Sequence, residues 1–228
     1  MDCKPIKELE IYLIRHGQSM GNAGYGRDDL TLKEANDPYL TEKGVHQASA
    51  CGKYLAETEF DAVYSSGLLR AVQTSAEILK HQKKQLPLYI QPLLTEVGVD
   101  ENYKGAGIEE IKSIYSAAEL ADGIGENNPL VCPSSMSDEE SVYDRAAKTV
   151  EYLRNKYRNG EKIAVVNHAA FMTFIVFGLM GFRKSPVFDI DFDNTNITKV
   201  VFYKEGTNKY GDIVFEYLNK TTHLELYM

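Results

Sequence analysis

The sequence alternates between short apolar runs and longer stretches in which apolar residues recur every three or four positions. Strand-like runs rich in β-branched and aromatic residues occupy positions 10–14, 61–64, 86–90 and 162–166. Segments with helical spacing begin at Thr41, Ser66 and Asp138. The most apolar run, at 169–182, is too short to span a bilayer, so we interpret it as a buried helix.

Strands that alternate with helices predict an α/β fold, with a mostly parallel sheet and helices on both faces. Two C-terminal runs, "ITKVVFYKEG" and "GDIVFEYLN", predict a strand hairpin. The least regular region holds a predicted helix around 108–118 and is otherwise rich in Gly, Pro, Asn and Ser. We expect a single domain over 1–228 with a lid-like insertion at 97–137, and a tolerated surface insertion remains the alternative.

Composition and charge limit the kinds of binding partner expected for this chain. The formal net charge is −8, which argues against general affinity for nucleic acid or acidic membranes. The three cysteines, Cys3, Cys51 and Cys132, form no CxxC pair, so we expect neither a disulfide framework nor a zinc site. The first residues lack the apolar core of a signal peptide. A reducing cytoplasm is the simplest setting for such a chain.

Charged and polar residues follow the predicted strands, and ligands of parallel sheets bind beyond these carboxyl ends. In chain order they are Arg15 with His16, Arg70, Glu96, and Asn167 with His168. Arginines offer fixed charge and forked donors suited to phosphate. A histidine can act as a nucleophile, and a carboxylic acid can protonate a leaving group. Each residue alone has an ordinary structural interpretation, but the combination favours phosphoryl chemistry.

Four segments carry a resemblance to a known family. In order, "LIRHGQSMGN", "LTEKGVHQA", "VYSSGLLRAVQTSAEI" and "VVNHAAF" resemble the histidine phosphatase superfamily, most closely its phosphoglycerate mutase-like branch. The later segments "DNTNITKV" and "YLNKTTHL" are similar to its closing segments. The resemblance covers nearly the whole chain outside about 99–137. It implies a phosphomonoester hydrolase that works through phosphohistidine, with no metal and no other cofactor.

The resemblance also implies roles for individual residues. His16 would be the nucleophile, and Glu96 would be the general acid that later activates water. The residues that would bind the phosphoryl oxygens or line and support their pocket are Arg15, Ser19, Asn22, Arg70, His168 and Asn194. The implied partner is a small phosphorylated substrate. The sequence leaves open which substrate this is and whether the chain forms a homodimer.

Two departures from the family pattern bear on the site. Gly67 stands where the family more often has a residue such as proline. The family's Trp-Glu-Gly is replaced by Tyr-Lys-Gly at 103–105, which leaves Asp100 and Glu101 as alternatives to Glu96 for the acid.

Two other functions remain as alternatives to hydrolysis. A phosphoglycerate mutase-type phosphotransferase would return the phosphoryl group to a second hydroxyl. The mutases' basic segment after their acidic residue is not recognisable here, which favours hydrolysis. A non-catalytic phosphate-binding module would normally have lost the nucleophile or the acid, and both residue types are present.

Overall fold

The computed structural model describes residues 4–24 and 30–227, so Cys3 lies outside the described residues. Within them, one sheet has the strand order β4-β3-β2-β5-β1-β6-β7. Its strands are β1 (Lys7–Arg15), β2 (Ala62–Ser65), β3 (Leu88–Ile90), β4 (Ala118–Leu120), β5 (Glu161–Asn167), β6 (Ile197–Tyr203) and β7 (Ile213–Lys220). Strands β1 to β5 pair in parallel, whereas β6 runs antiparallel to β1 and β7 antiparallel to β6. The predicted mostly parallel sheet with a C-terminal strand pair is confirmed.

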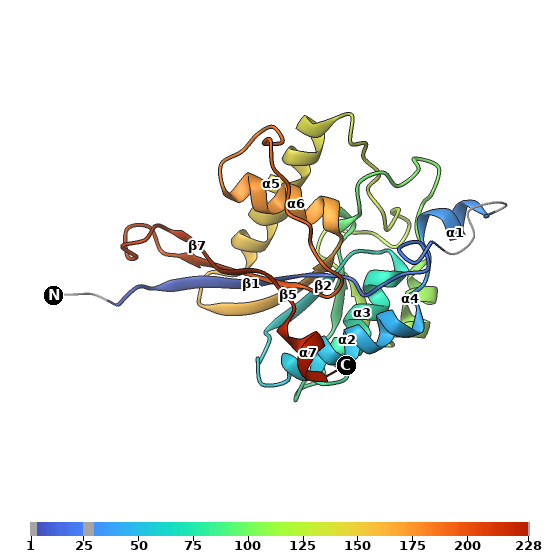
Figure 1. Cartoon of the computed structure of the whole chain (residues 1–228), viewed down its shortest axis with the longest axis horizontal. Helices are drawn as coiled ribbons and strands as arrows, with labels where there is room; N and C mark the ends of the chain where they lie inside the picture. The colour runs from blue at the N-terminus through green and yellow to red at the C-terminus, as the bar shows by residue number, and fades with distance from the viewer. Residues whose placement is uncertain (1–3, 25–29, 228) are drawn as a thin grey trace.

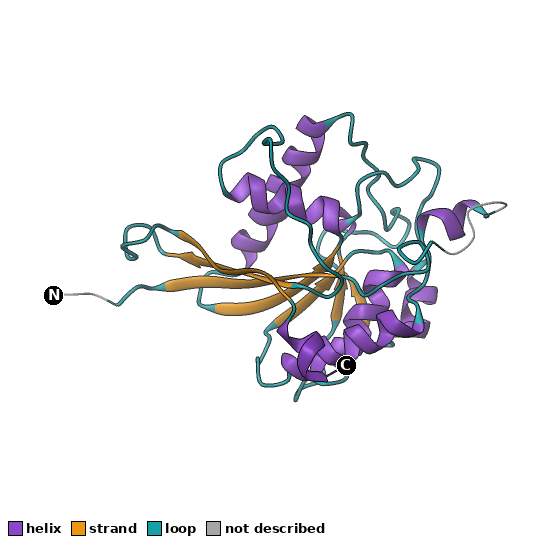
Figure 2. Cartoon of the chain, in the orientation of Figure 1, coloured by secondary structure: helices purple, strands orange, loops and turns teal. Residues whose placement is uncertain are grey.

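Helices cover both faces of this sheet (Figures 1 and 2). They are α1 (Leu32–Asn36), α2 (Glu42–Tyr54), α3 (Leu69–Leu79), α4 (Ile108–Ile114), α5 (Glu139–Lys156), α6 (Ala169–Leu179) and α7 (Thr222–Tyr227), with a 3₁₀ turn at Pro92–Leu94. Helices α5 and α6 pack together on one face, and α2, α3, α4 and α7 lie on the other (Figure 1). Figure 2 shows the sheet edge-on between the two helical layers.

The central strand β1 shows why the apolar run is continuous. Leu9, Ile11 and Leu13 are buried in the layer that contains α5 and α6. Tyr12 and Ile14 are buried in the opposite layer, with α3. A parallel strand covered on both faces needs apolar residues at every position rather than at alternate ones. This burial brings the carboxyl end of β1 into the middle of the molecule.

Some element boundaries differ from the sequence-based prediction. The helix expected at 108–118 ends at Ile114, because Tyr115 is extended and the chain then forms β4 beside β3. The helix expected from Ser66 begins at Leu69, because the Ser66 amide still donates to Val166 O as a continuation of the sheet. The insertion therefore adds a strand to the sheet edge, which the sequence did not predict.

Most of the apolar run at 169–182 forms α6, which ends at Leu179 and whose buried residues pack on α5 and the sheet. No helix in residues 4–24 and 30–227 combines the length and apolarity needed to cross a membrane. Cys51 and Cys132 are both free thiols.

Candidate active site

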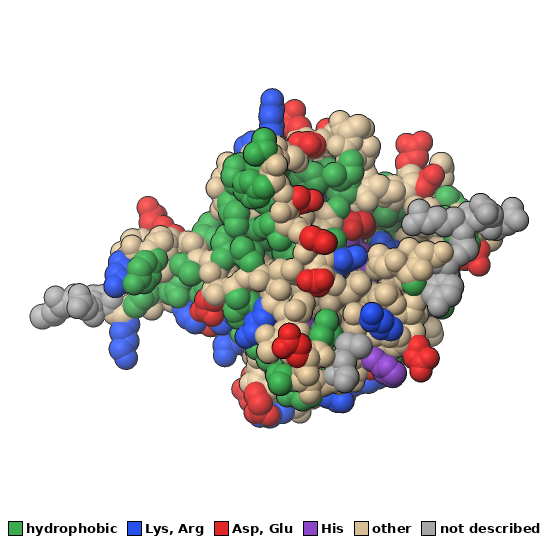
Figure 3. All heavy atoms as spheres, viewed as in Figure 1, with side chains coloured by type: hydrophobic (Ala, Val, Ile, Leu, Met, Phe, Trp, Pro, Cys, Tyr) green, Lys and Arg blue, Asp and Glu red, His purple; other side chains and the backbone are tan. Residues whose placement is uncertain are grey.

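The predicted site residues converge at the carboxyl ends of β1 and β5. Arg15 is the last residue of β1 and pairs in register with Asn167, the last residue of β5. Arg70 lies in the first turn of α3, and His168 is the N-cap of α6. Figure 3 shows recessed basic and histidine atoms near the middle of one face, bordered by acidic side chains. The surrounding charge is thus mixed, although the chain as a whole is acidic.

His16 has a defined tautomer. Its side chain is 3% exposed, and its Nδ1 lies 2.6 Å from Gly17 O. Because a carbonyl oxygen only accepts, Nδ1 carries the proton and Nε2 carries the lone pair. Arg70 Nε donates to this Nε2 at 3.3 Å. Burial, then the charges of Arg70 and Arg15, hold the pKa of His16 well below its usual range, so the ring is neutral at neutral pH.

A close backbone contact fixes the loop after His16. The Gly17 amide donates to Thr74 Oγ1 at 3.0 Å. A Cβ at position 17 would lie 2.4 Å from Gly44 O, and one at Gly44 would lie 2.0 Å from Gln18 O. Both positions require glycine, since a side-chain carbon at either would push α2 away from the loop. The amino end of α2 thus packs directly on the site.

His168 lies beside His16 and is fully buried. The two ring centroids are 5.0 Å apart. Neither ring nitrogen of His168, nor the side-chain amide of Asn167, has a hydrogen-bond partner among the described residues. Burial, then Arg70 and His16, lowers the pKa of His168 well below its usual range. Buried polar atoms are rarely left unpaired, so this cluster fits a polar ligand.

The two arginines are held by backbone carbonyls. Arg15 Nη1 donates to Phe192 O at 2.5 Å, and Arg70 Nη1 donates to Asn36 O at 2.9 Å. Burial lowers the pKa of both guanidinium groups, and the charge of Glu96 acts on both in the opposite direction. The carboxyl group that the resemblance singled out therefore lies close enough to influence both arginines.

Asp37 is a site residue that the sequence did not reveal. It is buried; its Oδ1 accepts from the Leu69 amide at 2.6 Å and lies 3.9 Å from Arg70 Nη1. Its Oδ2 accepts from the Tyr103 hydroxyl at 2.8 Å. Burial raises the pKa of Asp37, against the lowering effects of Tyr103 and Arg70. Since an Asp before a proline is typical of a turn, the sequence offered no signal for this role.

The remaining predicted phosphate-pocket residues are hydrogen-bonded to the loop that follows His16 or lie within it. Ser19 and Asn22 exchange hydrogen bonds at 3.3 Å, each through its own amide to the other's side chain. Asn194 Nδ2 donates to His16 O at 3.0 Å and lies 3.3 Å from Asn22 Oδ1. All three are thus brought to the loop of His16, and their side chains form hydrogen bonds within that loop or to it.

Glu96 lies at the amino end of α6, the helix that follows His168. Its Oε1 accepts from the Phe171 amide at 2.9 Å and from the Val97 amide at 2.8 Å. Its Oε2 accepts from the Ala170 amide at 3.3 Å. Amides at a helix amino end favour a negative group, so α6 holds the carboxyl group in place.

The alternative acids are placed differently. Asp100 and Glu101 are exposed, and the Asp100 carboxylate accepts hydrogen bonds from Asn102. Of the three candidates, only Glu96 is bonded to the helix that begins after His168.

The departure at Gly67 also has a structural reason. A Cβ at this position would lie 2.1 Å from Leu130 O, so the returning end of the insertion packs directly on its backbone. A bulkier residue here would force the two segments apart.

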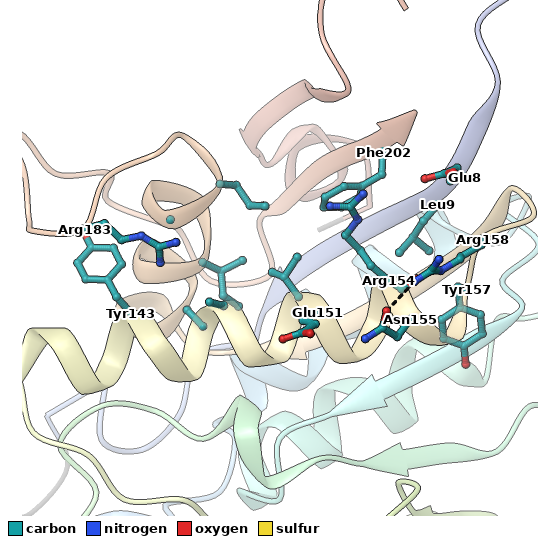
Figure 4. Close-up of a pocket in the computed structure, with 16 residues that line it drawn as sticks. Glu8, Leu9, Tyr143, Glu151, Arg154, Asn155, Tyr157, Arg158, Arg183 and Phe202 are labelled. Carbon is teal, nitrogen blue, oxygen red and sulfur yellow. Dashed lines mark hydrogen bonds between the residues drawn. The ribbon is translucent and has the colours of Figure 1, made fainter. Parts of the chain in front are cut away.

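A hollow elsewhere contains none of the predicted site residues. It measures about 500 Å³ and lies between α5, α6 and the outer half of β1 (Figure 4). Its labelled residues include Glu8, Arg154, Arg158 and Arg183. The predicted site residues lie instead at the carboxyl ends of β1 and β5. Across the described residues, no three His, Cys, Asp or Glu side chains are grouped to hold a metal ion.

Comparison with known proteins decides the family. The sequence pattern of the histidine phosphatase superfamily (branch 1) matches residues 11–210. The chain belongs to this superfamily. The prediction of family, including its phosphoglycerate mutase-like branch, is confirmed, and so is the prediction that the protein is an enzyme.

Two curated relatives of this histidine phosphatase are named as phosphatases. Phosphoserine phosphatase 1 of Hydrogenobacter thermophilus is 28% identical over 95% of this chain and 94% of its own length. Fructose-2,6-bisphosphatase TIGAR B of Danio rerio is 33% identical over 47% of this chain, and the match spans only 41% of that relative.

A mutase shares the fold. The crystal structure of phosphoglycerate mutase from Bacillus anthracis superposes with a TM-score of 0.61 at 20% identity, covering 98% of this chain and 97% of that one. The α/β fold of this histidine phosphatase is therefore that of its family.

Proposed function

We propose that this histidine phosphatase hydrolyses phosphate monoesters of small molecules through a phosphohistidine formed at His16. The observation that carries the proposal is the state of His16: a buried neutral ring whose unprotonated Nε2 accepts a hydrogen bond from Arg70 Nε and lies beside the ring of His168. A neutral imidazole with an available nitrogen is the form that attacks phosphorus.

The first step follows from this arrangement. His16 Nε2 forms a bond to phosphorus while the bond from phosphorus to the leaving oxygen breaks, and that electron pair goes to the oxygen. Arg15, Arg70 and His168 stabilise the charge on the phosphoryl oxygens. Phosphoryl transfer depends mainly on such positioning and charge stabilisation, so a preorganised cluster of this kind is sufficient.

Glu96 takes part in both steps of the reaction. Its protonated form gives a proton to the leaving oxygen. Its ionised form then takes a proton from water, whose oxygen bonds to phosphorus as the phosphorus–nitrogen bond breaks and the electron pair returns to His16. The amides of Ala170 and Phe171 hold the carboxyl group in one place through both steps.

The distinction from a mutase rests on the acceptor. We therefore test phosphate release from phosphoserine, sugar bisphosphates, nucleotides and phosphoglycerates, with isomerisation of phosphoglycerate measured in parallel. The proposal expects phosphate release from at least one substrate at a rate well above isomerisation, and no release by His16→Ala. Faster isomerisation would identify a mutase, and binding of phosphate without turnover would identify a binding module.

Catalysis without a metal is part of the proposal, because two guanidinium groups supply the positive charge. Activity is expected to survive dialysis against EDTA, and vanadate is expected to inhibit competitively as a mimic of five-coordinate phosphorus. Loss of activity on chelation that magnesium or zinc restores would contradict this mechanism.

The same proposal extends to the setting of the enzyme. We place it in the cytoplasm, as its free thiols Cys51 and Cys132 favour, with no nucleic-acid or membrane partner. We propose a single domain in which residues 97–137 form a lid-like cover beside the site. The hydrogen bond from Tyr103 to Asp37 and the packing of Leu130 on Gly67 support that placement.

A further inference from the structure

Arg145 is a buried cation with an unusual set of partners. It lies on α5, is 5% exposed, and forms no ion pair with a carboxylate within 4 Å among the described residues. Burial lowers its pKa to about 10, so it remains charged at neutral pH. A buried charge without an ion-pair partner costs stability, and its contacts indicate what it does instead.

The guanidinium group of Arg145 donates hydrogen bonds to the backbone just before Glu96. Nη1 donates to Leu93 O at 2.8 Å and to Thr95 O at 2.6 Å, so the carbonyls three residues and one residue before Glu96 share one donor nitrogen. Nη2 donates to Ser134 Oγ at 2.8 Å. The returning end of the insertion is thereby tied to the same group.

The guanidinium group of Arg145 also lies over the ring of Phe171, a residue that helps to hold Glu96. The guanidinium carbon lies 3.9 Å from the ring centroid of Phe171, the residue whose amide donates to Glu96 Oε1. A stacked cation of this kind restrains the ring and the guanidinium together. One side chain thus restrains both the loop that carries Glu96 and the helix turn that holds its carboxyl group.

We propose that Arg145 is the positioning residue for the acid–base group Glu96, acting through Thr95 and Phe171 without binding the phosphoryl group. The inference rests on the proposed function. A small displacement of a catalytic group can cost about 100-fold in rate. Loss of the Arg145 contacts should therefore slow mainly the step that needs Glu96.

The leaving group provides the test. An alkyl phosphate needs a proton from Glu96, whereas p-nitrophenyl phosphate hardly does. In single turnovers, Arg145→Met is expected to slow phosphoryl transfer from the best alkyl phosphate of the screen about 10- to 100-fold. With p-nitrophenyl phosphate the loss is expected to stay within about threefold. The matched control is Arg154→Met on the same helix, whose guanidinium stacks on Phe202 beside the hollow in Figure 4; it should match wild type on both substrates.

A double variant separates positioning from general damage. If Arg145 acts through Glu96, Arg145→Met with Glu96→Gln should be no more than about threefold slower on the alkyl phosphate than Glu96→Gln alone. Equal losses of Arg145→Met on both substrates, or losses that multiply in the double variant, would overturn the proposal.

Two further outcomes are also decisive. If Arg145→Met does not fold, as judged by circular dichroism, Arg145→Lys takes its place, because lysine keeps the charge but lacks the two-pronged guanidinium group. A loss of rate confined to the alkyl phosphate supports the proposal. Wild-type rates on both substrates overturn it. If Glu96→Gln itself shows no preference between the substrates, the acid assignment under the proposed function has failed. In that case a selective loss in Arg145→Met would overturn action through Glu96.

Discussion

The two histidines of the site, His16 and His168, are kept uncharged by burial and by the arginines beside them. An isolated histidine would be partly protonated near neutral pH, since its pKa is about 6.5. Here the proton on Nδ1 of His16 is donated to Gly17 O, which leaves Nε2 unprotonated, with its lone pair facing Arg70 Nε. The proposed nucleophile is therefore prepared both by Gly17, its neighbour in sequence, and by Arg70, which lies 54 positions away.

Thr74 offers a test of how that loop is held. Its hydroxyl accepts from the Gly17 amide at 3.0 Å and donates to Arg70 O at 2.7 Å. Thr74→Val keeps the shape but leaves a buried amide unpaired, so unfolding free energy should fall by about 1–3 kcal/mol, measured by urea denaturation. Ser75→Ala is the control, since its hydroxyl only donates to Ala71 O within the helix. Similar losses in both variants would contradict a special role for Thr74.

Among the elements, the insertion is the one whose packing bears most directly on the site. Its returning end passes over Gly67, and the Cys132 amide donates to Thr95 Oγ1 at 2.9 Å, next to Glu96. Ser134 reaches Arg145 from the same stretch. The proposed acid, Glu96, is therefore supported by a segment that the sequence shows only as an irregular region.

Gly67→Ala tests this contact between elements. The added carbon would meet Leu130 O at 2.1 Å, so the variant is expected to lose about 1–3 kcal/mol of unfolding free energy, together with activity on alkyl phosphates. Gly107→Ala is the matched control within the insertion, because nothing lies within 4 Å of its added carbon. The test is to measure thermal unfolding and turnover of both variants. A Gly67→Ala enzyme as stable and active as the control would show that the two segments separate freely.

Over the whole molecule, buried histidines make stability depend on pH. Folding lowers the pKa of His16 and His168, and it lowers that of His223, which bonds to Thr195, to about 4. The unfolded chain then binds more protons than the folded one below about pH 6.5. The histidine contribution is therefore present above about pH 6.5 and is lost as the pH falls toward the folded pKa values. The raised pKa of Asp37 has the opposite effect on stability. Its contribution to the unfolding free energy is present below about pH 3.8 and is lost as the pH rises through the folded pKa.

Urea unfolding from pH 7 to pH 5 checks this expectation. The unfolding free energy should fall on acidification, with each buried histidine contributing at most about 1.4 kcal/mol per pH unit. His223→Gln should flatten the curve, because it removes a group that titrates in this window. A free energy that is constant or rises toward pH 5 would contradict the account.

The sequence revealed the parts of the fold that local pattern determines. The doubly covered strands form continuous apolar runs, and the residues after them, such as His16 and His168, could be expected to meet because parallel strands end at one edge. Asp37 could not be found this way, since Tyr103 reaches it from 66 positions along the chain. Arg145 did leave a signal: it lies three residues after the buried Val142, on a helix face where an arginine is rarely buried without purpose.

The central claim is that the phosphoryl group passes through His16. The most direct measurement is mass spectrometry of the enzyme quenched in alkali during turnover of p-nitrophenyl phosphate, because phosphohistidine is stable there. We predict a phosphate adduct on the peptide containing His16, more abundant in Glu96→Gln, where water is activated slowly, and absent in His16→Ala. Turnover with no adduct on His16 in Glu96→Gln, or an adduct on another residue, would contradict the account.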